Sequence, residues 1–442
     1  MTSRDGGTGQ AWAALGGPEE LAGRVGYQGP SGLGDGPLPV RELARATVGA
    51  CALAAAELAA ARAGGGADDV APLLIDEGAV ATAFVSERHL LVDGRAPVTF
   101  APLSGFWRAA DGWVRTHANY PHHESALVRV LGAGTREGVA GAIARRRAVD
   151  VQEEVYAAGG LAVSVMTEGY GAPQPLVERT VSGLRGRPLG AVDAGAALPM
   201  AGVRVLDLTR VIAGPVATRT LGLLGADVLR IDSPGLPESD DAYADTGFGK
   251  RSALLDLAEA GDRAVFDGLL AGADVVVTGY RPGALERYGL GAEELLARRP
   301  GIVVAELCAW GWRGPWAGRR GFDSLVQAGY GISAACGDGH GPGVLPAQAL
   351  DHGTGYLAAA GVLRALAEGG GQALRFSLAG TASGLVREVP GAGAAVPGYA
   401  PEPWLREAAS GYGPLRYAAS PLGGRGWQRG PSRWGTDRPV WL

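Results

Sequence analysis

The feature that most constrains the fold is a strand–helix–strand pattern beginning near residue 203. Residues 203–208 and 226–232 are short apolar runs with the composition of buried β-strands. Between them, Gly214 and Pro215 mark the expected start of a helix, and Gly225 marks its expected end. Two parallel strands joined by a helix form a β-α-β unit. We therefore predict an α/β fold with an open, parallel, Rossmann-like sheet, whose ligands lie beyond the carboxyl ends of the strands.

The loop after the first strand argues against an ordinary nicotinamide enzyme. Such enzymes bind the cofactor's diphosphate with a Gly-x-Gly-x-x-Gly turn at this position. Residues 209–215 read Thr-Arg-Val-Ile-Ala-Gly-Pro instead. The sheet is thus expected to hold a different ligand.

Five segments indicate the class of protein more specifically than the apolar periodicity does. In chain order they are residues 199–215, 224–232, 249–257, 273–290 and 320–328. These segments resemble the class III CoA-transferase family, which includes formyl-CoA transferase, carnitine-related CoA-transferases and α-methylacyl-CoA racemases. The resemblance covers about 180 residues. It implies a smaller α+β domain beside the sheet domain, coenzyme A as a substrate with no permanently bound cofactor, and an interlocked homodimer. The expected reaction is transfer of CoA between an acyl-CoA and a carboxylic acid.

The resemblance places the family's nucleophilic aspartate on Asp351, at the start of a helix after a Gly-rich segment. A carboxylate suits this reaction, because its attack on an acyl-CoA gives a mixed anhydride and the returning thiolate then gives an aspartyl thioester. The backbone amide of Gly353 is a candidate donor to the developing oxyanion. The alternative is that Asp351 only caps the helix, which is a common role for Asp at a helix start.

Five further residues are candidates for binding CoA. By the resemblance, Arg281 lies near the CoA phosphates, and Ile212 replaces a glutamine that formyl-CoA transferase places near its small substrate. Lys250 and Arg251 follow an expected loop and are candidates for the 3′-phosphate, with surface charge as the alternative. Asp232 ends the second strand, where an acid can meet the adenosine ribose or serve as a turn residue.

The racemase branch of the family is less well matched. Its catalytic histidine would lie between Gly321 and Asp323, where this chain has Phe322. His352 adjoins Asp351 but points in a different direction on a helix, and His340 lies in a loop. We therefore prefer a transferase over a racemase-like isomerase. A catalytically worn, CoA-ester-binding subunit is the other alternative.

Nearly 200 residues precede the first strand of the β-α-β unit, and they resemble parts of the same family. Residues 56–83 parallel residues 361–383, and Glu42 stands where Asp351 stands in the later copy. The predicted organisation is a flexible segment over residues 1–36, a degenerate family half over 37–197 with a small-domain-like region, a CoA-binding and catalytic domain over 198–390, and an extended tail over 391–442.

Composition agrees with a soluble enzyme. The length of 442 residues predicts two or three domains, and 47% apolar residues is ample for large cores. A net charge of −5 without a basic face argues against a nucleic-acid partner. No apolar run of membrane-spanning length and no signal peptide is evident, so we expect a cytoplasmic protein without a membrane partner. The cysteines and histidines lack metal-ligand spacing, so no metal is expected. Gly, Ala and Arg enrichment suggests a bacterial source.

Overall fold

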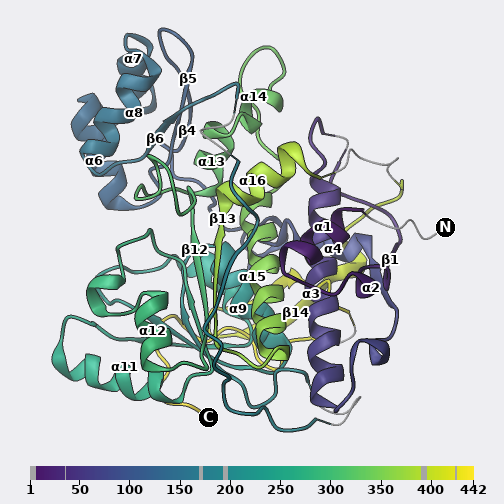
Figure 1. Ribbon diagram of the computed structural model, residues 1–442. Helices are drawn as coiled ribbons and strands as arrows, with labels where there is room; N and C mark the ends of the chain where they lie inside the picture. The colour runs from purple at the N-terminus through teal and green to yellow at the C-terminus, as the bar shows by residue number, and fades with distance from the viewer. Residues whose placement is uncertain (1–5, 35, 169–172, 193–197, 390–395, 424–425) are drawn as a thin grey trace.

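The structure is a computed structural model that describes residues 6–34, 36–168, 173–192, 198–389, 396–423 and 426–442. A large α/β domain lies beneath a smaller α+β domain in Figure 1, and the C-terminal residues return to the large domain. The N-terminal helices lie beside the large domain rather than apart from it.

The predicted strand–helix–strand unit lies in the middle of a seven-stranded sheet with the order β10-β9-β8-β11-β12-β13-β7. Its strands are β7 (Glu178–Val181), β8 (Arg204–Leu208), β9 (Asp227–Asp232), β10 (Lys250–Leu254), β11 (Val275–Thr278), β12 (Val303–Cys308) and β13 (Gln372–Ser377). All pairs are parallel except β13 with β7. In chain order the parallel strands run 3-2-1-4-5-6, as in doubly wound nucleotide-binding sheets. The expected α/β fold with a large parallel sheet is confirmed.

Both faces of this sheet are apolar and covered by helices. Val205 and Val275 face the main core, which includes α9 (Ala213–Leu223) and α15 (Ala349–Ala367). The next residues along the two strands, Leu206 and Val276, face a second core under α11 (Ala260–Gly272) and α12 (Ala292–Arg298). This alternation follows from the two-residue period of a strand and explains why the strands read as continuous apolar runs.

The smaller domain has its own core, built around Trp107, Leu127, Ile143 and Val151. Its antiparallel sheet has the order β4-β5-β6, with strands β4 (Gly105–Arg108), β5 (Trp113–Thr116) and β6 (Ala162–Ser164). Its helices are α6 (Pro121–Leu131), α7 (Arg136–Ala144) and α8 (Ala148–Ala157). They lie at the upper left of Figure 1, above the carboxyl ends of the main strands.

The N-terminal segment differs from the expected flexible piece. Its described part forms α1 (Gly6–Ala14), α2 (Glu19–Ala22) and β1 (Val25–Gln28). Trp12, Leu15 and Leu21 are buried, and the guanidinium of Arg364 on α15 lies 4.9 Å from the centre of the Trp12 ring. The expectation of flexibility is therefore wrong for residues 6–34, because a few large apolar side chains among the glycines anchor the segment on the core.

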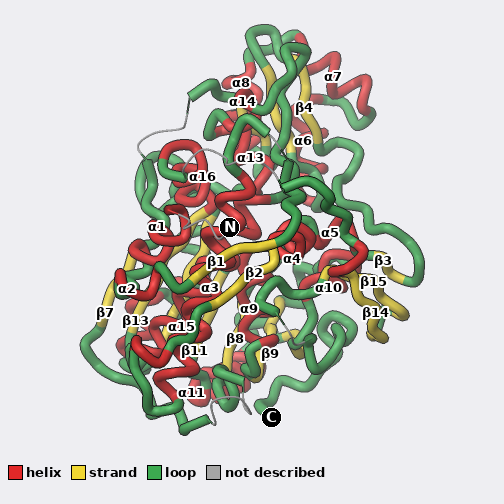
Figure 2. The backbone as a smooth tube through the Cα atoms, turned by 90° about the vertical axis from the view of Figure 1, so that its right-hand side faces the viewer, coloured by secondary structure: helices red, strands yellow, loops and turns green. Residues whose placement is uncertain are grey.

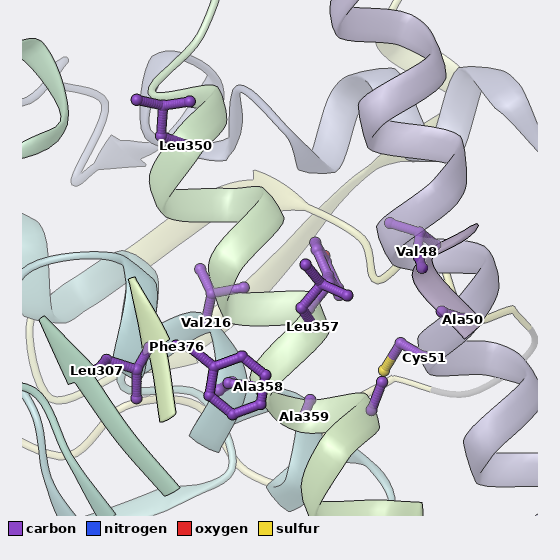
Figure 3. Close-up of a cluster of buried hydrophobic side chains, with 14 of the residues drawn as sticks. Val48, Ala50, Cys51, Val216, Leu307, Leu350, Leu357, Ala358, Ala359 and Phe376 are labelled. Atoms are coloured by element: carbon purple, nitrogen blue, oxygen red, sulfur yellow. The ribbon is translucent and has the colours of Figure 1, made fainter. Parts of the chain in front are cut away.

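Helix α3 (Val40–Arg62) lies along α15, so the N-terminal half contributes directly to the core of the large domain. Figure 3 shows Val48 and Cys51 of α3 facing Leu357 and its neighbours on α15. By length and composition, α3 is the one described helix long and apolar enough to cross a membrane, but 67% of its apolar window is buried inside the protein. A core helix of a soluble protein has the same properties.

The internal repeat predicted from the sequence is visible as the same order of elements. Helix α3 is followed by β2 (Leu73–Asp76) and α4 (Glu77–Ala83), just as α15 is followed by β13 and α16 (Leu378–Arg387). Asp76 caps α4 by accepting a hydrogen bond from Ala79 N (3.0 Å), and Ser377 caps α16 in the same way from Gly380 N (2.9 Å). Strands β1 and β2 form a separate parallel pair, seen at the centre of Figure 2.

The span 37–197 was expected to be one degenerate family half. In the structure it is divided among three places. Its first part, with α5 (Ser86–His89) and β3 (Leu91–Val92), packs on the large domain; its middle forms the smaller domain; and β7 joins the main sheet. The other short helices are α10 (Asp240–Thr246), α13 (Asp323–Gly329) and α14 (Ile332–Ala335).

The C-terminal segment, expected to be extended, includes a hairpin of β14 (Leu405–Ser410) and β15 (Gly413–Ala418), which pairs with β3. Beyond the hairpin the chain runs along the outer edge of β10, where Thr436 bridges Ala253 and Asp437 N donates to Ser252 O (2.8 Å). The indole of Trp441 then donates to Leu269 O (3.0 Å). The tail is thus part of the sheet domain.

Candidate active site

A cavity of about 460 Å³ lies at the carboxyl ends of β8 and β11. These are the neighbouring strands from which the chain proceeds in opposite directions across the sheet, the usual ligand position in doubly wound folds. The loops that follow the two strands contribute Arg210 and Arg281 to its wall, and the start of α15 contributes Asp351. The smaller domain supplies another part of the wall through Tyr120, His122 and His123.

Asp351 is the third residue of α15 and is only 7% exposed. Among the cavity-lining residues that the structure describes, it is the one carboxylate. Its turn is held by Asp323, whose Oδ2 accepts hydrogen bonds from Leu350 N (2.9 Å) and Asp351 N (3.0 Å). The helix cap is therefore Asp323, which leaves the Asp351 side chain facing the cavity. The alternative that Asp351 serves only as a cap does not fit this geometry.

Burial raises the pKa of Asp351 well above its usual range, and the nearby carboxylates of Asp323 and Glu87 raise it further. Burial also raises the pKa of Asp323, but there the hydrogen bonds from Asp351 N, Gln327 and Leu350 N oppose the shift. Hydrogen bonds to a carboxylate favour its ionised form. We therefore assign the proton of this close pair to Asp351. The ionised form of Asp351 becomes abundant only as pH rises above the ordinary carboxyl range.

The N-terminal half supplies a second charge next to Asp351. Glu87 on α5 lies 3.1 Å, Oε2 to Nε2, from the buried His352 on α15. The hydrogen bond from His352 lowers the pKa of Glu87 against the opposing effect of burial. Glu87 is therefore ionised behind Asp351, and its charge disfavours a second carboxylate nearby.

Arginines make the rest of the cavity strongly cationic. Arg210 and Arg319 line it but are engaged with Glu238 (3.5 Å) and Glu153 (2.6 Å). Arg281, Arg287 and Arg320 also line it, are exposed, and form no ion pair with any carboxylate in the described parts of the chain. Guanidinium groups bind phosphate oxygens in a bidentate way, so these three suit the phosphates of CoA. Of the predicted site residues, the cavity thus brings together Asp351 and Arg281.

Lys250 and Arg251, predicted near the 3′-phosphate, lie elsewhere. The Lys250 ammonium is fully buried and donates to Asp207 Oδ2 and Pro215 O, both at 3.0 Å. Arg251 donates to Asp227 Oδ1 (2.7 Å) and to the tail at Val440 O. Both cations are satisfied inside the protein, so the prediction that they bind CoA is wrong for the structure described here.

The Asp232 carboxylate also has partners within the protein. It is 2% exposed, pairs with Arg230 at 2.7 Å, and accepts a hydrogen bond from the Trp434 indole at 2.9 Å. These partners close the strand end where a ribose was predicted. Asp232 therefore stabilises the contact between the sheet and the tail.

Ile212 and Gly353 are near the cavity but do not line it. Ile212 packs on the main core, while its neighbours Val211 and Ala213 reach the wall. Gly353 is the fifth residue of α15, a position where the amide is taken by an intrahelical hydrogen bond. A Cβ at Gly353 would lie 3.2 Å from Thr381 Cγ2, so the glycine serves helix packing rather than an oxyanion.

Sequence reasoning missed Val211, Tyr120 and His123 as wall residues. Val211 has a φ of 70°, a left-handed conformation that is rare for a β-branched residue and is often found at functional sites. No local sequence pattern predicts this backbone conformation at Val211. The adjacent pair His122 and His123 has no metal-ligand spacing, and its position on the wall depends on how the smaller domain docks.

Known CoA-transferases are similar in sequence to part of this chain. Residues 200–413 match the model of CoA-transferase family III. A fungal acetyl-coenzyme A transferase, nodX of Hypoxylon pulicicidum, is 38% identical over 177 residues, which are 38% of this chain and 30% of the relative. The probable fatty acyl-CoA transferase Rv3272 of Mycobacterium tuberculosis is 34% identical over 184 residues, 38% of this chain and 47% of the relative.

The chain matches less than half the length of these curated relatives. A crystal structure of the M. tuberculosis protein superposes with a TM-score of 0.41 and 33% identity, covering 43% of this chain and 56% of that one. The match to the family model includes β8, β11 and the start of α15, which contribute to the cavity wall. The similarity to CoA-transferase family III thus extends over residues 200–413 of this chain.

Proposed function

We propose that this chain transfers coenzyme A between an acyl-CoA and a carboxylic acid through covalent intermediates on Asp351. The observation that carries the proposal is the position of Asp351, the single acid on the described wall of a cavity lined by five arginines. The backbone amides of Leu350 and Asp351 donate to Asp323 and so fix the turn that carries the Asp351 carboxyl. A carboxyl oriented in this way suits nucleophilic attack. The arginines provide the positive charge that binds the phosphates of CoA.

The reaction divides into exchanges at carbonyl carbons. A carboxylate oxygen of Asp351 attacks the thioester carbonyl, the carbon–sulfur bond breaks, and a mixed anhydride and CoA thiolate result. The thiolate then attacks the aspartyl carbonyl, which releases the first acid as a carboxylate and leaves CoA on Asp351 as a thioester. The acceptor acid attacks this thioester, and the reverse sequence frees the new acyl-CoA and the Asp351 carboxylate.

Proton exchange at the α-carbon is the less favoured reaction. Phe322 occupies the place of the racemase histidine and cannot act as a base. His352, the other candidate, is fully buried and engaged with Glu87, and it does not line the cavity. The interlocked homodimer implied by the resemblance remains a prediction, which mass photometry of the purified chain would test.

Trapping the intermediate tests the proposed function directly. Incubation with an acyl-CoA and hydroxylamine should convert Asp351 to a hydroxamate, which peptide mass spectrometry would locate. Asp351→Asn should abolish the label and reduce CoA exchange by roughly 10³-fold or more. Asp68→Asn is the matched control, because Asp68 is a fully exposed acid remote from the cavity. Labelling at another residue, or exchange that survives in Asp351→Asn, would contradict the proposal.

A further inference from the structure

The side chain of Gln327 joins the two ends of the segment that leads to Asp351. Gln327 lies on α13, one helical turn after Asp323, and is 1% exposed. Its Oε1 accepts a hydrogen bond from Leu345 N (3.0 Å), and its Nε2 donates to Asp323 Oδ1. Asp323 Oδ2 accepts from the backbone amides of Leu350 and Asp351. Two side chains of α13 therefore hold this segment at both of its ends.

The backbone determines which way the Gln327 amide points. Leu345 N is a donor, so the atom of Gln327 that faces it is the amide oxygen, and the NH2 group faces Asp323. Exchanging the two amide atoms would set two donors against each other at Leu345 and two acceptors against each other at Asp323. Asp323 therefore has three N–H donors, two from the backbone and one from Gln327.

These donors favour the ionised form of Asp323. Burial raises the pKa of Asp323 to about 6, and the hydrogen bonds from Asp351 N, Gln327 and Leu350 N act against that rise. Two neighbouring buried carboxyls do not both ionise at low cost, so a donor to one of them affects which one keeps the proton. The Gln327 amide thus favours the charge on Asp323 and the proton on Asp351.

The other groups that act on this pair are charged or titratable. Helix α13 packs against β5, β6, α14, α15 and α16. From these elements, the groups that act on Asp323 are the buried Arg115 of β5, and Asp351 and His352 of α15. Glu87 of α5 acts on Asp351. The amide on α13 is the uncharged member of this network, so replacing it leaves the other charges in place.

We propose that Gln327 is a positioning residue of the Asp351 reaction: it holds the turn that carries Asp351 and keeps the negative charge on Asp323. The proposal rests on the proposed function and adds to it a residue that does not line the cavity and acts through Asp323. While Asp351 is ionised it is repelled by Asp323, but acylation leaves Asp351 uncharged and ends that repulsion. A charge held on Asp323 therefore favours the covalent intermediates over the free Asp351 carboxylate.

Two substitutions separate this role from simple filling of space. Gln327→Met keeps the approximate volume but removes both hydrogen bonds. Gln327→Glu keeps the shape: while protonated, the introduced carboxyl accepts from Leu345 N and donates to Asp323, and once ionised it repels Asp323 instead. The readout is the rate of hydroxamate formation on Asp351 of the full chain with acetyl-CoA, butyryl-CoA or succinyl-CoA, divided by the rate of the unaltered chain at the same pH.

Gln327→Met should lower this ratio about tenfold or more across about pH 5–9, because a misplacement of about 1 Å can cost 10²-fold in rate. Gln327→Glu should stay within about threefold of the unaltered chain near pH 5 and fall about tenfold or more toward pH 9, since ionisation of the introduced carboxyl breaks the contact with Asp323. A residue that only fills space gives a ratio that does not change with pH.

Gln372→Glu is the matched control. Gln372 on β13 is 2% exposed, donates to Glu368 Oε2 (2.6 Å) and accepts from Arg179 Nη2 (3.0 Å), so it is a buried amide in a similar arrangement that does not line the cavity. The ratio for Gln372→Glu should stay near one at every pH.

Hydrogen exchange of the peptide that contains residues 345–351, followed by mass spectrometry, tests the contact without any substrate. These amides should exchange at least about tenfold faster in Gln327→Met than in the unaltered chain. A ratio independent of pH in Gln327→Glu, or an unchanged exchange rate in Gln327→Met, overturns the inference. So does exchange of this peptide in the unaltered chain as fast as in an exposed loop, whether or not the variants fold. No hydroxamate from any of the three thioesters refutes the proposed function, while the exchange measurement still tests the role of Gln327.

Discussion

At the scale of single residues, the site is defined by two aspartates with different tasks. Asp323 accepts backbone hydrogen bonds and fixes a helix start, while Asp351 accepts none from the described residues and faces the cavity. Two neighbouring buried carboxyls cannot both ionise at low cost. The geometry therefore gives the charge to Asp323 and the proton to Asp351, whose buried carboxyl is costly to ionise.

The free-energy cost of burying the Asp351 carboxyl predicts that Asp351→Asn stabilises the protein in a pH-dependent way. The folded-state pKa of Asp351 is raised, so folding opposes its ionisation. Below the unfolded pKa of about 3.9 both forms are neutral and the penalty is absent. The penalty grows as pH rises from there toward the raised folded pKa. Asp351→Asn should thus melt roughly 1–3 °C higher at pH 7.5 and with a smaller gain at pH 5, by differential scanning fluorimetry. A gain independent of pH would contradict this assignment.

How far the site was predictable also shows at this scale. Asp351 and Arg281 followed from family motifs, and both lie on the cavity wall. Lys250 and Arg251 were misassigned because their partners, Asp207 and Val440, are 43 and 189 residues away in sequence. A local pattern cannot show that a charge is already paired by a distant segment. His123 was missed for the same reason, since its environment is created by domain packing.

At the scale of elements, the position of the nucleophile depends on α15 lying between α3 and α9. The helix is rich in Gly and Ala, which lets neighbouring backbones approach closely. A Cβ at Gly355 would lie 2.6 Å from the carbonyl oxygen of Ala213 and 2.9 Å from the Val216 side chain on α9. The contact is therefore too close for any other residue, although Gly lowers intrinsic helix stability.

Two Gly→Ala substitutions should consequently have opposite signs. Gly355→Ala should destabilise the protein by about 1–3 kcal/mol through overpacking against α9. Gly268→Ala, in the exposed face of α11 with no atom within 4 Å of the added Cβ, should stabilise it by about 0.5–1 kcal/mol. Urea denaturation of both variants measures the difference. Equal effects at the two positions would show that α15 and α9 are not in close contact.

Elements with strong periodicity were predicted well, and weakly patterned ones were not. The strands expected at 203–208 and 226–232 correspond to β8 and β9 within one residue at each end. The N-terminal residues were expected to be flexible because Gly obscured the pattern, yet Trp12 and Leu15 are buried there. A short helix held mainly by tertiary contacts has little local signal.

At the scale of the whole molecule, the N-terminal half is a structural part of the large domain. Helix α3 covers the outer side of α15, and Arg364 on α15 forms an ion pair with Glu57 on α3 at 2.7 Å. Arg62, near the end of α3, donates to the carbonyl oxygens of Pro199 (2.8 Å) and Ala201 (2.9 Å), just before β8. The two halves thus share one core, which the division at residue 197 expected from sequence did not anticipate.

Separating the halves should therefore prevent folding. A fragment of residues 198–442 would expose the apolar surface of α15 that α3 covers, and we expect it to aggregate or to lack a cooperative thermal transition. Co-expression with residues 1–197 should restore solubility and thioester-dependent labelling of Asp351. A monomeric 198–442 fragment with a sharp melting transition would show that the N-terminal half is dispensable for the fold.

The tail beside β10 has a consequence for how the molecule meets its own copies. Open edges of parallel sheets offer unpaired amide and carbonyl groups that recruit strands from other chains. Here residues 435–437 occupy one edge, and the short antiparallel strand β7, with the charged side chains of Glu178 and Arg179, terminates the other. Continuous extension of this sheet between molecules is therefore blocked at the β10 edge and disfavoured at the short, charged β7 edge. Self-association through the β10 edge of the main sheet is therefore not expected, because the chain's own C-terminal residues already occupy that edge.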